Sequence, residues 1–263
     1  MAKGKSKVGT TMGSSGSVIG GGSLPAATNQ VTPPTPAQIA KGNTLPKGGV
    51  AFSQFETMTD DQKADVINTA LRTGIPMFLD DSGLQRFAYF TGMSDKPTVV
   101  SDAKLDSISG KEIYRTVYDG YNSRTDIGYT GNDVVKQIRN GDFTMYSDSG
   151  GSAHGKGIYF ASDYRDSALY GMGQRNPIIT RAKITSNKVI TENKLNSDFN
   201  SAVRRGDKLA TACNSADYSS ARNLYALAKG YDVVSASNGY HMVLNRRALT
   251  MSDKVKPATG YSW

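Results

Sequence analysis

The sequence predicts an α+β fold, and two observations carry this prediction. The first periodic pattern along the chain is helical, and it is followed by several short apolar strands with helices between them. These strands do not alternate regularly with helices, as they would in a parallel sheet built from βαβ units. At 263 residues, the chain is long enough for one core of ordinary size or for two small domains.

Residues 1–50 are predicted to form a flexible basic arm. They hold five lysines and no acidic residue, so +5 of the formal net charge of +8 belongs to them and only +3 to the other 213 residues. They also hold ten of the 28 glycines and five of the nine prolines. Such a composition buries too little apolar surface to offset the entropy of ordering a backbone. A solvated linker fits these residues better than a dedicated nucleic-acid tail.

The remaining elements are predicted from periodicity and from capping residues. A helix starts after Thr59 and ends before Gly74, with Ala64, Ile67 and Leu71 at helical spacing. With a second short helix expected at 84–90, residues 51–109 are predicted to form a helical lead-in. Residues 110–250 are predicted to form the main domain, and residues 251–263 a C-terminal tail. Further helices are expected at 130–139, 162–170 and 219–229, and strands at 113–117, 143–146, 157–161, 178–184, 188–190, 231–235 and 240–245.

Composition also argues against several classes of protein. Lys3 to Lys7 are followed by Gly, Thr and Ser rather than by the apolar stretch of a secretory signal, and no run approaches the length of a membrane span. One cysteine, Cys213, and two histidines, His154 and His241, cannot form a Cys/His metal cluster. We therefore expect no metal site, no membrane partner and a cytoplasmic location, with Cys213 as a packing residue.

A glycine-rich loop at 150–157 permits two interpretations. Gly150, Gly155 and Lys156 match the first seven positions of a phosphate-binding P-loop, but Gly157 stands where that motif needs a Ser or Thr. A P-loop must also open a helix, whereas residues 158–161 are apolar and β-prone. The sequence therefore favours a strand followed by a helix capped by Ser162 or Asp163, with Tyr159 on the strand and Tyr170 near the helix end.

The segment G-K-G-I-Y-F-A followed by S-x-x-Y, with its two tyrosines eleven positions apart, resembles a known motif. It is similar to the nicotinamide-binding segment of the poly(ADP-ribose) polymerase and diphtheria-toxin branch of the ADP-ribosyltransferases. The resemblance implies that Tyr159 and Tyr170 stack on the nicotinamide of NAD⁺, that Ser167 hydrogen-bonds its carboxamide and that Gly157 lies in the same cofactor-binding segment.

Two upstream segments resemble the arginine-type branch of the same superfamily. The β-prone run 113–117 contains Arg115, which is costly to bury unless it meets an anion. The resemblance implies that Arg115 holds the diphosphate and ribose of NAD⁺. Residues 146–149, Tyr-Ser-Asp-Ser, look like the aromatic-S-T-S element of that branch, which implies that Ser147 and Ser149 also bind the dinucleotide.

The catalytic glutamate of this family is missing from the corresponding late strand. The strand 240–245 follows Ser-Asn-Gly, and the glutamate position falls on Gly239, Tyr240 or His241, depending on a one-residue slip. His241 thus joins Arg115 and Tyr159 as a candidate catalytic residue. Over residues 110–250, the resemblance implies two facing antiparallel β-sheets with an NAD⁺-binding cleft.

Two functions remain open. The first is an NAD⁺-dependent ADP-ribosyltransferase that passes ADP-ribose to a macromolecular acceptor, either protein or nucleic acid. The second is a non-catalytic binding or structural module of a larger, for example viral, assembly. Both tyrosines could instead be core residues, and Arg115 could be an exposed strand residue paired with Glu112 or Asp119.

Overall fold

A computed structural model describes residues 52–73, 96–122, 127–140, 157–216 and 218–258. The first described elements are α2 (Phe52–Thr57) and α3 (Asp60–Thr73), and α3 confirms the helix predicted after Thr59. Thr59 and Gln62 cap it reciprocally: the Thr59 amide donates to Gln62 Oε1 (2.9 Å) and the Gln62 amide to Thr59 Oγ1 (3.3 Å). The helix expected at 84–90 and the strand expected at 143–146 lie outside the described residues.

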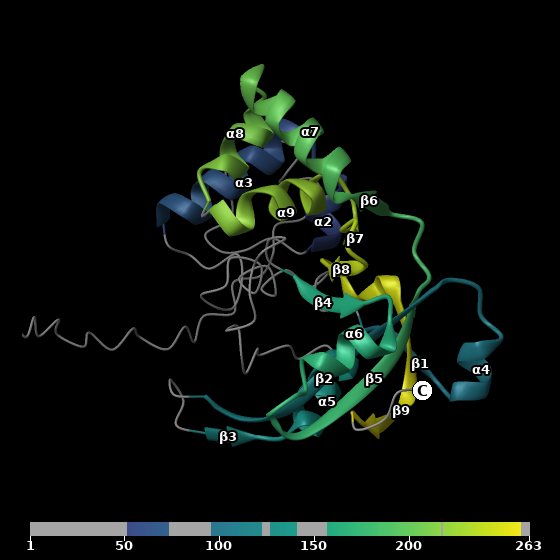
Figure 1. The fold of residues 1–263 in the computed structure, drawn as a ribbon. Helices are drawn as coiled ribbons and strands as arrows, with labels where there is room; N and C mark the ends of the chain where they lie inside the picture. The colour runs from purple at the N-terminus through teal and green to yellow at the C-terminus, as the bar shows by residue number, and fades with distance from the viewer. Residues whose placement is uncertain (1–51, 74–95, 123–126, 141–156, 217, 259–263) are drawn as a thin grey trace, which may run out of the picture. The chain divides into compact units, whose positions relative to one another are not determined.

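The described strands form one hydrogen-bonded sheet with the order β1-β9-β5-β2-β4-β8-β7-β6, and β3 pairs with β2 (Figure 1). Most pairs are antiparallel; β1 with β9 and β6 with β7 are parallel. This mixture of a largely antiparallel sheet with helices confirms the α+β class. The strands are β1 (Thr98–Val100), β2 (Lys111–Asn122), β3 (Ile127–Tyr129), β4 (Ile158–Ala161), β5 (Arg175–Ile184), β6 (Val189–Thr191), β7 (Val233–Ser235), β8 (Tyr240–Val243) and β9 (Leu249–Pro257).

The sheet has a narrow junction between β2 and β4. These two strands pair only at Tyr114 with Ala161, whereas β2 and β5 pair from Lys111 with Ile184 to Asp119 with Arg175. We call β1, β9, β5 and β2 the long-strand half and β4, β8, β7 and β6 the short-strand half.

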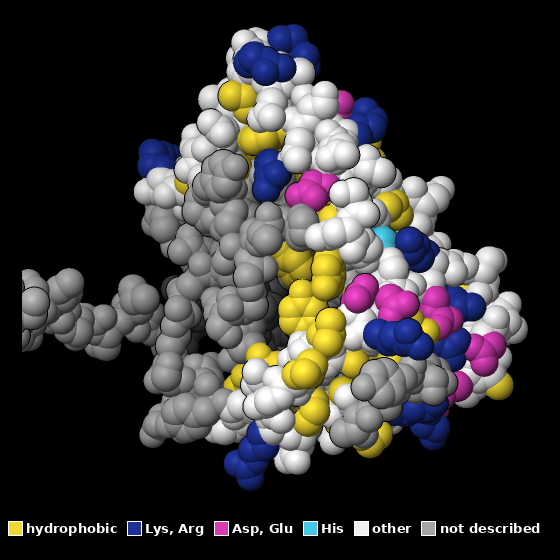
Figure 2. Space-filling view, viewed as in Figure 1, with side chains coloured by type: hydrophobic (Ala, Val, Ile, Leu, Met, Phe, Trp, Pro, Cys, Tyr) yellow, Lys and Arg dark blue, Asp and Glu magenta, His cyan; other side chains and the backbone are white. Residues whose placement is uncertain are grey.

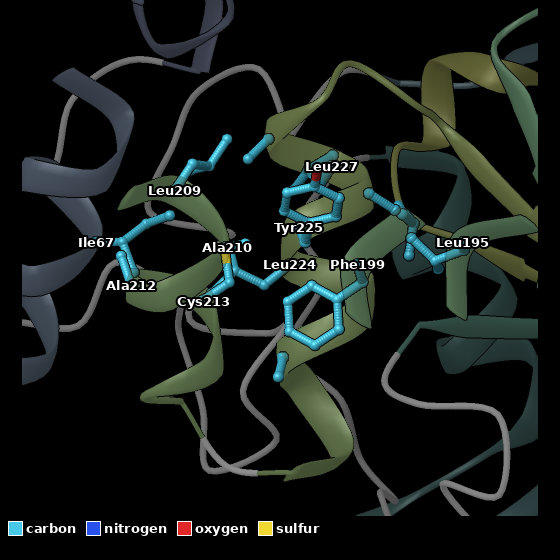
Figure 3. Packing of buried hydrophobic residues seen from close by; sticks show 14 of the residues in the cluster. Ile67, Leu195, Phe199, Leu209, Ala210, Ala212, Cys213, Leu224, Tyr225 and Leu227 are labelled. Carbon is cyan, nitrogen blue, oxygen red and sulfur yellow. The ribbon is translucent and has the colours of Figure 1, made fainter. Parts of the chain in front are cut away.

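Helices cover one face of the short-strand half. The helices α2, α3, α7 (Glu192–Arg204), α8 (Lys208–Asn214) and α9 (Tyr218–Ala228) share one hydrophobic cluster with residues of β6, β7 and β8. Figure 3 shows Phe199 of α7 beside Tyr225 of α9, and their ring centroids are 5.3 Å apart. Cys213 of α8 is fully buried in this cluster, and burial raises the pKa of its thiol, as expected for a packing residue.

A second hydrophobic cluster draws on both halves of the sheet. Ile158 and Phe160 of β4 pack here, whereas Tyr159 between them packs against the helical cluster, because successive side chains on a strand point to opposite faces. From the long-strand half come Ile113, Ala182 and Met251. The short-strand half therefore has helices on one face and residues of the long-strand half in the cluster on its other face.

The sheet and the core of the structure extend beyond residues 110–250, the range predicted for the main domain. Strand β9 runs to Pro257 between β1 and β5, so the sheet extends past residue 250, where we expected the tail to begin. The lead-in helix α3 also shares the main core: Ile67 is buried in the helical cluster, and the Lys63 ammonium donates to the Ala228 carbonyl at the end of α9 (2.8 Å).

Three further short helices are described: α4 (Asp102–Asp106) contacts β9, α5 (Gly131–Asn140) contacts β2 and β5, and α6 (Tyr164–Leu169) contacts β2 and β4.

A charged network fixes α2 to the short-strand half. Arg247 donates from Nη1 to Glu56 Oε2 (2.8 Å) and from Nη2 to Asp232 Oδ1 (3.0 Å). Asp232 is buried and also accepts a hydrogen bond from the Ser186 hydroxyl (2.9 Å). The hydrogen bond from Arg247 is the main cause that lowers the pKa of Glu56.

We predict that Arg247→Met lowers the free energy of unfolding by about 1.5 to 3 kcal/mol, because it leaves two carboxylates without their charged donor. Urea titration at pH 7 measures this, and the exposed Arg204→Met is the control, expected within about 0.5 kcal/mol of wild type. Since the folded pKa of Glu56 lies below 4.5, its stabilising contribution is present above that pH. As the pH falls below 4.5, this contribution to the free energy of unfolding should decrease. Part of the difference in stability between the wild type and Arg247→Met should disappear with it. A deficit unchanged down to the folded pKa would exclude this pair as its cause.

Candidate functional site

Arg115 lies on β2 at the junction of the two halves. Its Nη1 donates to the carbonyl of Tyr159 on β4 (2.8 Å), and its buried Nε has no hydrogen-bond partner among the described residues. Burial lowers the pKa of Arg115 to about 10. A guanidinium that is partly buried and unneutralised attracts an anion.

The alternative pairing of Arg115 with Glu112 or Asp119 is not observed. Glu112 binds Arg181 Nη2 (2.8 Å), and Asp119 accepts hydrogen bonds from the Gly131 amide (2.9 Å) and from Asn176 Nδ2 (2.7 Å). Arg181 itself is flanked by Asp106 and Glu112, whose hydrogen bonds raise its pKa despite burial. Arg115 therefore differs from Arg247, which meets two carboxylates, and from Arg181, which meets three.

Helix α6 brings Ser167 to β2. Asp163 is its N-cap, one of the two residues predicted for that role, and accepts from the Arg165 amide (2.7 Å). Ser167 is buried, and its Oγ lies 3.1 Å from Oγ1 of Thr116, the residue after Arg115. The predicted carboxamide ligand is thus held against Thr116, whose side chain points to the face of β2 opposite that of Arg115.

The tyrosines form the aromatic part of the site. Tyr159 on β4 is half-buried, and Tyr170, the C-cap of α6, is 58% exposed. The ring of Tyr170 meets that of Tyr240, at the start of β8, with centroids 6.0 Å apart and planes at 86°. A hydrogen bond with Tyr170, together with partial burial, raises the pKa of Tyr240 to about 12. Tyr159 and Tyr240 share one face of the short-strand half, because both pack against the helical cluster.

Apolar side chains are exposed beside these tyrosines. Leu169 is 61% and Met172 71% exposed, next to Tyr170. Figure 2 shows a stripe of apolar side chains running over the region of α6 and the neighbouring edge of the short-strand half. Such a contiguous patch is typical of a binding surface.

His241 does not join the tyrosine site. It pairs across the strands with Phe160 and Ser235, on the face of β8 opposite Tyr240. Its Nε2 lies 2.8 Å from Ser162 Oγ and its Nδ1 lies 2.8 Å from Ser235 Oγ. Burial, and secondarily the charge of Lys111, lowers the pKa of His241 to about 4.

The register of β8 shows where the three residues expected at the glutamate position lie. Gly239 precedes the strand in a left-handed conformation (φ 87°), Tyr240 lies at the tyrosine site and His241 faces away. Asp232, the acid closest in sequence to this strand, is engaged by Arg247. Asp166, one helical turn before Tyr170, is the carboxylate whose charge raises the pKa of Tyr240.

Sequence reasoning missed three residues of the site: Thr116, Asp166 and Tyr240. The spacing of Asp166 four residues before Tyr170 was a usable signal, whereas the hydroxyl pair of Thr116 with Ser167 was visible only in three dimensions. Of the other predicted site residues, Gly157 directly precedes β4. A Cβ at Gly157 would lie 3.1 Å from Met242 Cβ. Ser147, Ser149 and His154 lie outside the described residues.

No family model, curated protein or solved structure gives a significant match to this chain. Within the described ranges, no helix is long and apolar enough to cross a membrane. The same ranges contain no group of three or more His, Cys, Asp or Glu side chains placed to hold a metal ion. The site is therefore interpreted from its own geometry.

We predict that Gly171→Ala destabilises the protein, because Gly171 sets the contact of α6 with β2. A Cβ there would lie 2.7 Å from Pro177 Cβ and 3.1 Å from Thr116 Cγ2, and such overpacking costs about 1 to 3 kcal/mol. Thermal unfolding measures the effect. Gly128→Ala is the matched control, since its nearest contact would be at 3.9 Å. Equal melting temperatures for both variants would show that α6 moves freely against β2.

Proposed function

We propose that the protein is an NAD⁺-dependent ADP-ribosyltransferase that transfers ADP-ribose to a macromolecular acceptor and releases nicotinamide. The observation that carries this proposal is the guanidinium of Arg115, which is hydrogen-bonded to the carbonyl of Tyr159 and meets no carboxylate among the described residues. A cation for the diphosphate and an aromatic wall for the nicotinamide thus come from adjacent strands. We infer that the two halves of the sheet are the two facing sheets of the fold and that NAD⁺ binds in a cleft between them.

Each residue has a role in this reaction. Arg115 holds the diphosphate, Tyr159 and Tyr170 stack on the nicotinamide, and Ser167, positioned by Thr116, hydrogen-bonds the carboxamide. The bond between ribose C1′ and the nicotinamide nitrogen breaks, and its electron pair leaves with nicotinamide. The acceptor atom then bonds to C1′ and gives up its proton.

The transition state of this reaction needs a negative charge near the ribose. The cation that develops on the ribose is stabilised best by a fixed anion in a partly dry site. Tyr240, with a pKa near 12, is a neutral phenol at physiological pH, so it cannot supply that charge. Asp166, whose charge acts on the same phenol, is exposed on α6 and lacks the dry surroundings that this role needs.

A second function is favoured by the residues at the start of β8. Gly239 and Tyr240 stand where a carboxylate would be needed, which suits a non-catalytic module that binds a dinucleotide or serves a larger, for example viral, assembly. Both proposals place the protein in the cytoplasm, of the host if the chain is viral. They differ in whether nicotinamide is released.

We predict that Tyr170→Ala weakens NAD⁺ binding by about 1 to 3 kcal/mol, the usual effect of losing one aromatic stack. Isothermal titration calorimetry on folded protein measures this. Leu71→Ala, an exposed apolar residue of α3 outside the site, is the control and should bind as wild type does. Identical affinities for wild type and Tyr170→Ala would remove Tyr170 from the site.

We predict that Arg115→Ala reduces ADP-ribose transfer at least tenfold, because a charge-assisted contact worth on the order of 1.5 to 3 kcal/mol is lost. Labelled NAD⁺ incubated with cell lysate provides the measurement, and Arg175→Ala, an exposed β5 variant, is the control. Equal labelling by wild type and Arg115→Ala would discard Arg115 as a site residue. Absence of label with wild type, despite NAD⁺ binding, would select the non-catalytic module.

A further inference from the structure

A second cluster of functional groups lies outside the tyrosine site. His241 is 3% exposed, and its two ring nitrogens each lie 2.8 Å from a serine hydroxyl, Nε2 from Ser162 and Nδ1 from Ser235. The three residues come from neighbouring elements: Ser162 follows β4, His241 lies on β8 and Ser235 ends β7. The cluster is on the face of β8 opposite Tyr240, so the residues proposed to bind NAD⁺ do not use it.

The backbone holds Ser162 in place. Its amide donates to the carbonyl of Gly239 (2.8 Å), which fixes the end of β4 to the turn before β8. The next residue, Asp163, caps α6. Ser162 remains partly exposed while His241 beneath it is buried, so an incoming molecule can reach the hydroxyl but not the imidazole.

The two contacts suit either tautomer of a neutral histidine. In the tautomer that activates Ser162, its hydroxyl donates to Nε2 and the Nδ1 proton is donated to Ser235 Oγ. Burial and the charge of Lys111 keep the imidazole neutral at physiological pH, with a pKa of about 4. A serine, a base that accepts its proton and a third group that orients the base form the arrangement of an activated nucleophile.

We propose that Ser162 is a nucleophile for activated acyl groups, with His241 as its base and Ser235 as a positioning residue. The Ser162 oxygen bonds to the carbonyl carbon of an ester while its proton passes to His241 Nε2. The ester C–O bond then breaks, and the alcohol leaves with that proton. Lys111, whose charge acts at His241, opposes formation of the imidazolium. This inference is independent of the proposed NAD⁺ chemistry.

The low pKa of His241 predicts a slow attack of Ser162 on its electrophile. A base with a pKa far below the working pH takes up a proton weakly in the transition state. We therefore expect covalent capture of a reactive electrophile rather than rapid turnover of an ordinary ester.

A fluorophosphonate probe tests the proposal on the full chain. The Ser162 oxygen should bond to phosphorus as the P–F bond breaks and fluoride leaves, with the serine proton released through His241 to solvent. Intact-mass spectrometry should show one adduct, and peptide mapping should place it on Ser162. Ser162→Ala should abolish the adduct, and His241→Gln, which retains a hydrogen-bonding group but cannot act as the base, should slow labelling at least about tenfold.

Two further variants complete the test. Ser235→Ala should slow labelling because the imidazole loses its orienting partner, and it serves as the readout if His241→Gln does not fold. Ser107→Ala, an exposed serine at the end of α4, should label like wild type. Absence of any adduct on wild type, an adduct mapped to another serine, or labelling of Ser235→Ala and His241→Gln at the wild-type rate would each overturn the proposal.

Discussion

The junction between β2 and β4 is the contact on which the site depends. The two halves of the sheet share one backbone pair there, Tyr114 with Ala161, and the adjacent Arg115 donates to the Tyr159 carbonyl. Beyond this pair, the backbone pairing of β2 with β4 ends, and the guanidinium of Arg115 supplies a further hydrogen bond between the two strands. The position of this guanidinium is therefore set by the strands and not by a carboxylate. The hydrophobic cluster drawn from both halves includes Ile113 of β2 and Phe160 of β4, which lie beside this junction. Helix α6 is then tied to β2 through Ser167 and Thr116.

The arginines differ in the groups that they meet and in the direction of their pKa shifts. Arg181 meets three carboxylates and Arg247 two, and both arginines have a raised pKa despite the cost of burial. Arg115 has a lowered pKa and donates to a backbone carbonyl, as does Arg139. Within the described residues, the buried Nε atoms of Arg115, Arg139 and Arg181 have no hydrogen-bond partner. Carboxylates thus neutralise the charge of Arg181 and Arg247, whereas Arg115 meets the carbonyl of Tyr159. Of the tyrosines, Tyr159 lies next to this charge through its backbone carbonyl, which accepts a hydrogen bond from Arg115 Nη1.

The sequence predicted the elements whose local signals agree and missed those where they conflict. Helix α3 has a capping box and regular apolar spacing, and β4 is a short apolar run after glycine, so both were predictable. Helix α7 was missed although Leu195, Phe199 and Ala202 are buried at helical spacing, because Asn, Ser and Asp between them favour turns. Strand β9 was assigned to the tail because its second half is charged and leads to Pro257. The face occupied by His241 depends on strand register, which changes with a slip of one residue.

The central claim is that one ligand spans Arg115 and the tyrosines. Calorimetric titration of the wild-type protein with NAD⁺ and, separately, with ADP-ribose tests this claim most directly, because the two ligands share the diphosphate and differ in the nicotinamide. The account predicts that both bind, since both reach Arg115, and that NAD⁺ binds more tightly by about the 1 to 3 kcal/mol of aromatic stacking. Equal affinities would contradict the aromatic part of the site. No binding of either ligand would contradict the anion site at Arg115 and with it the proposed function.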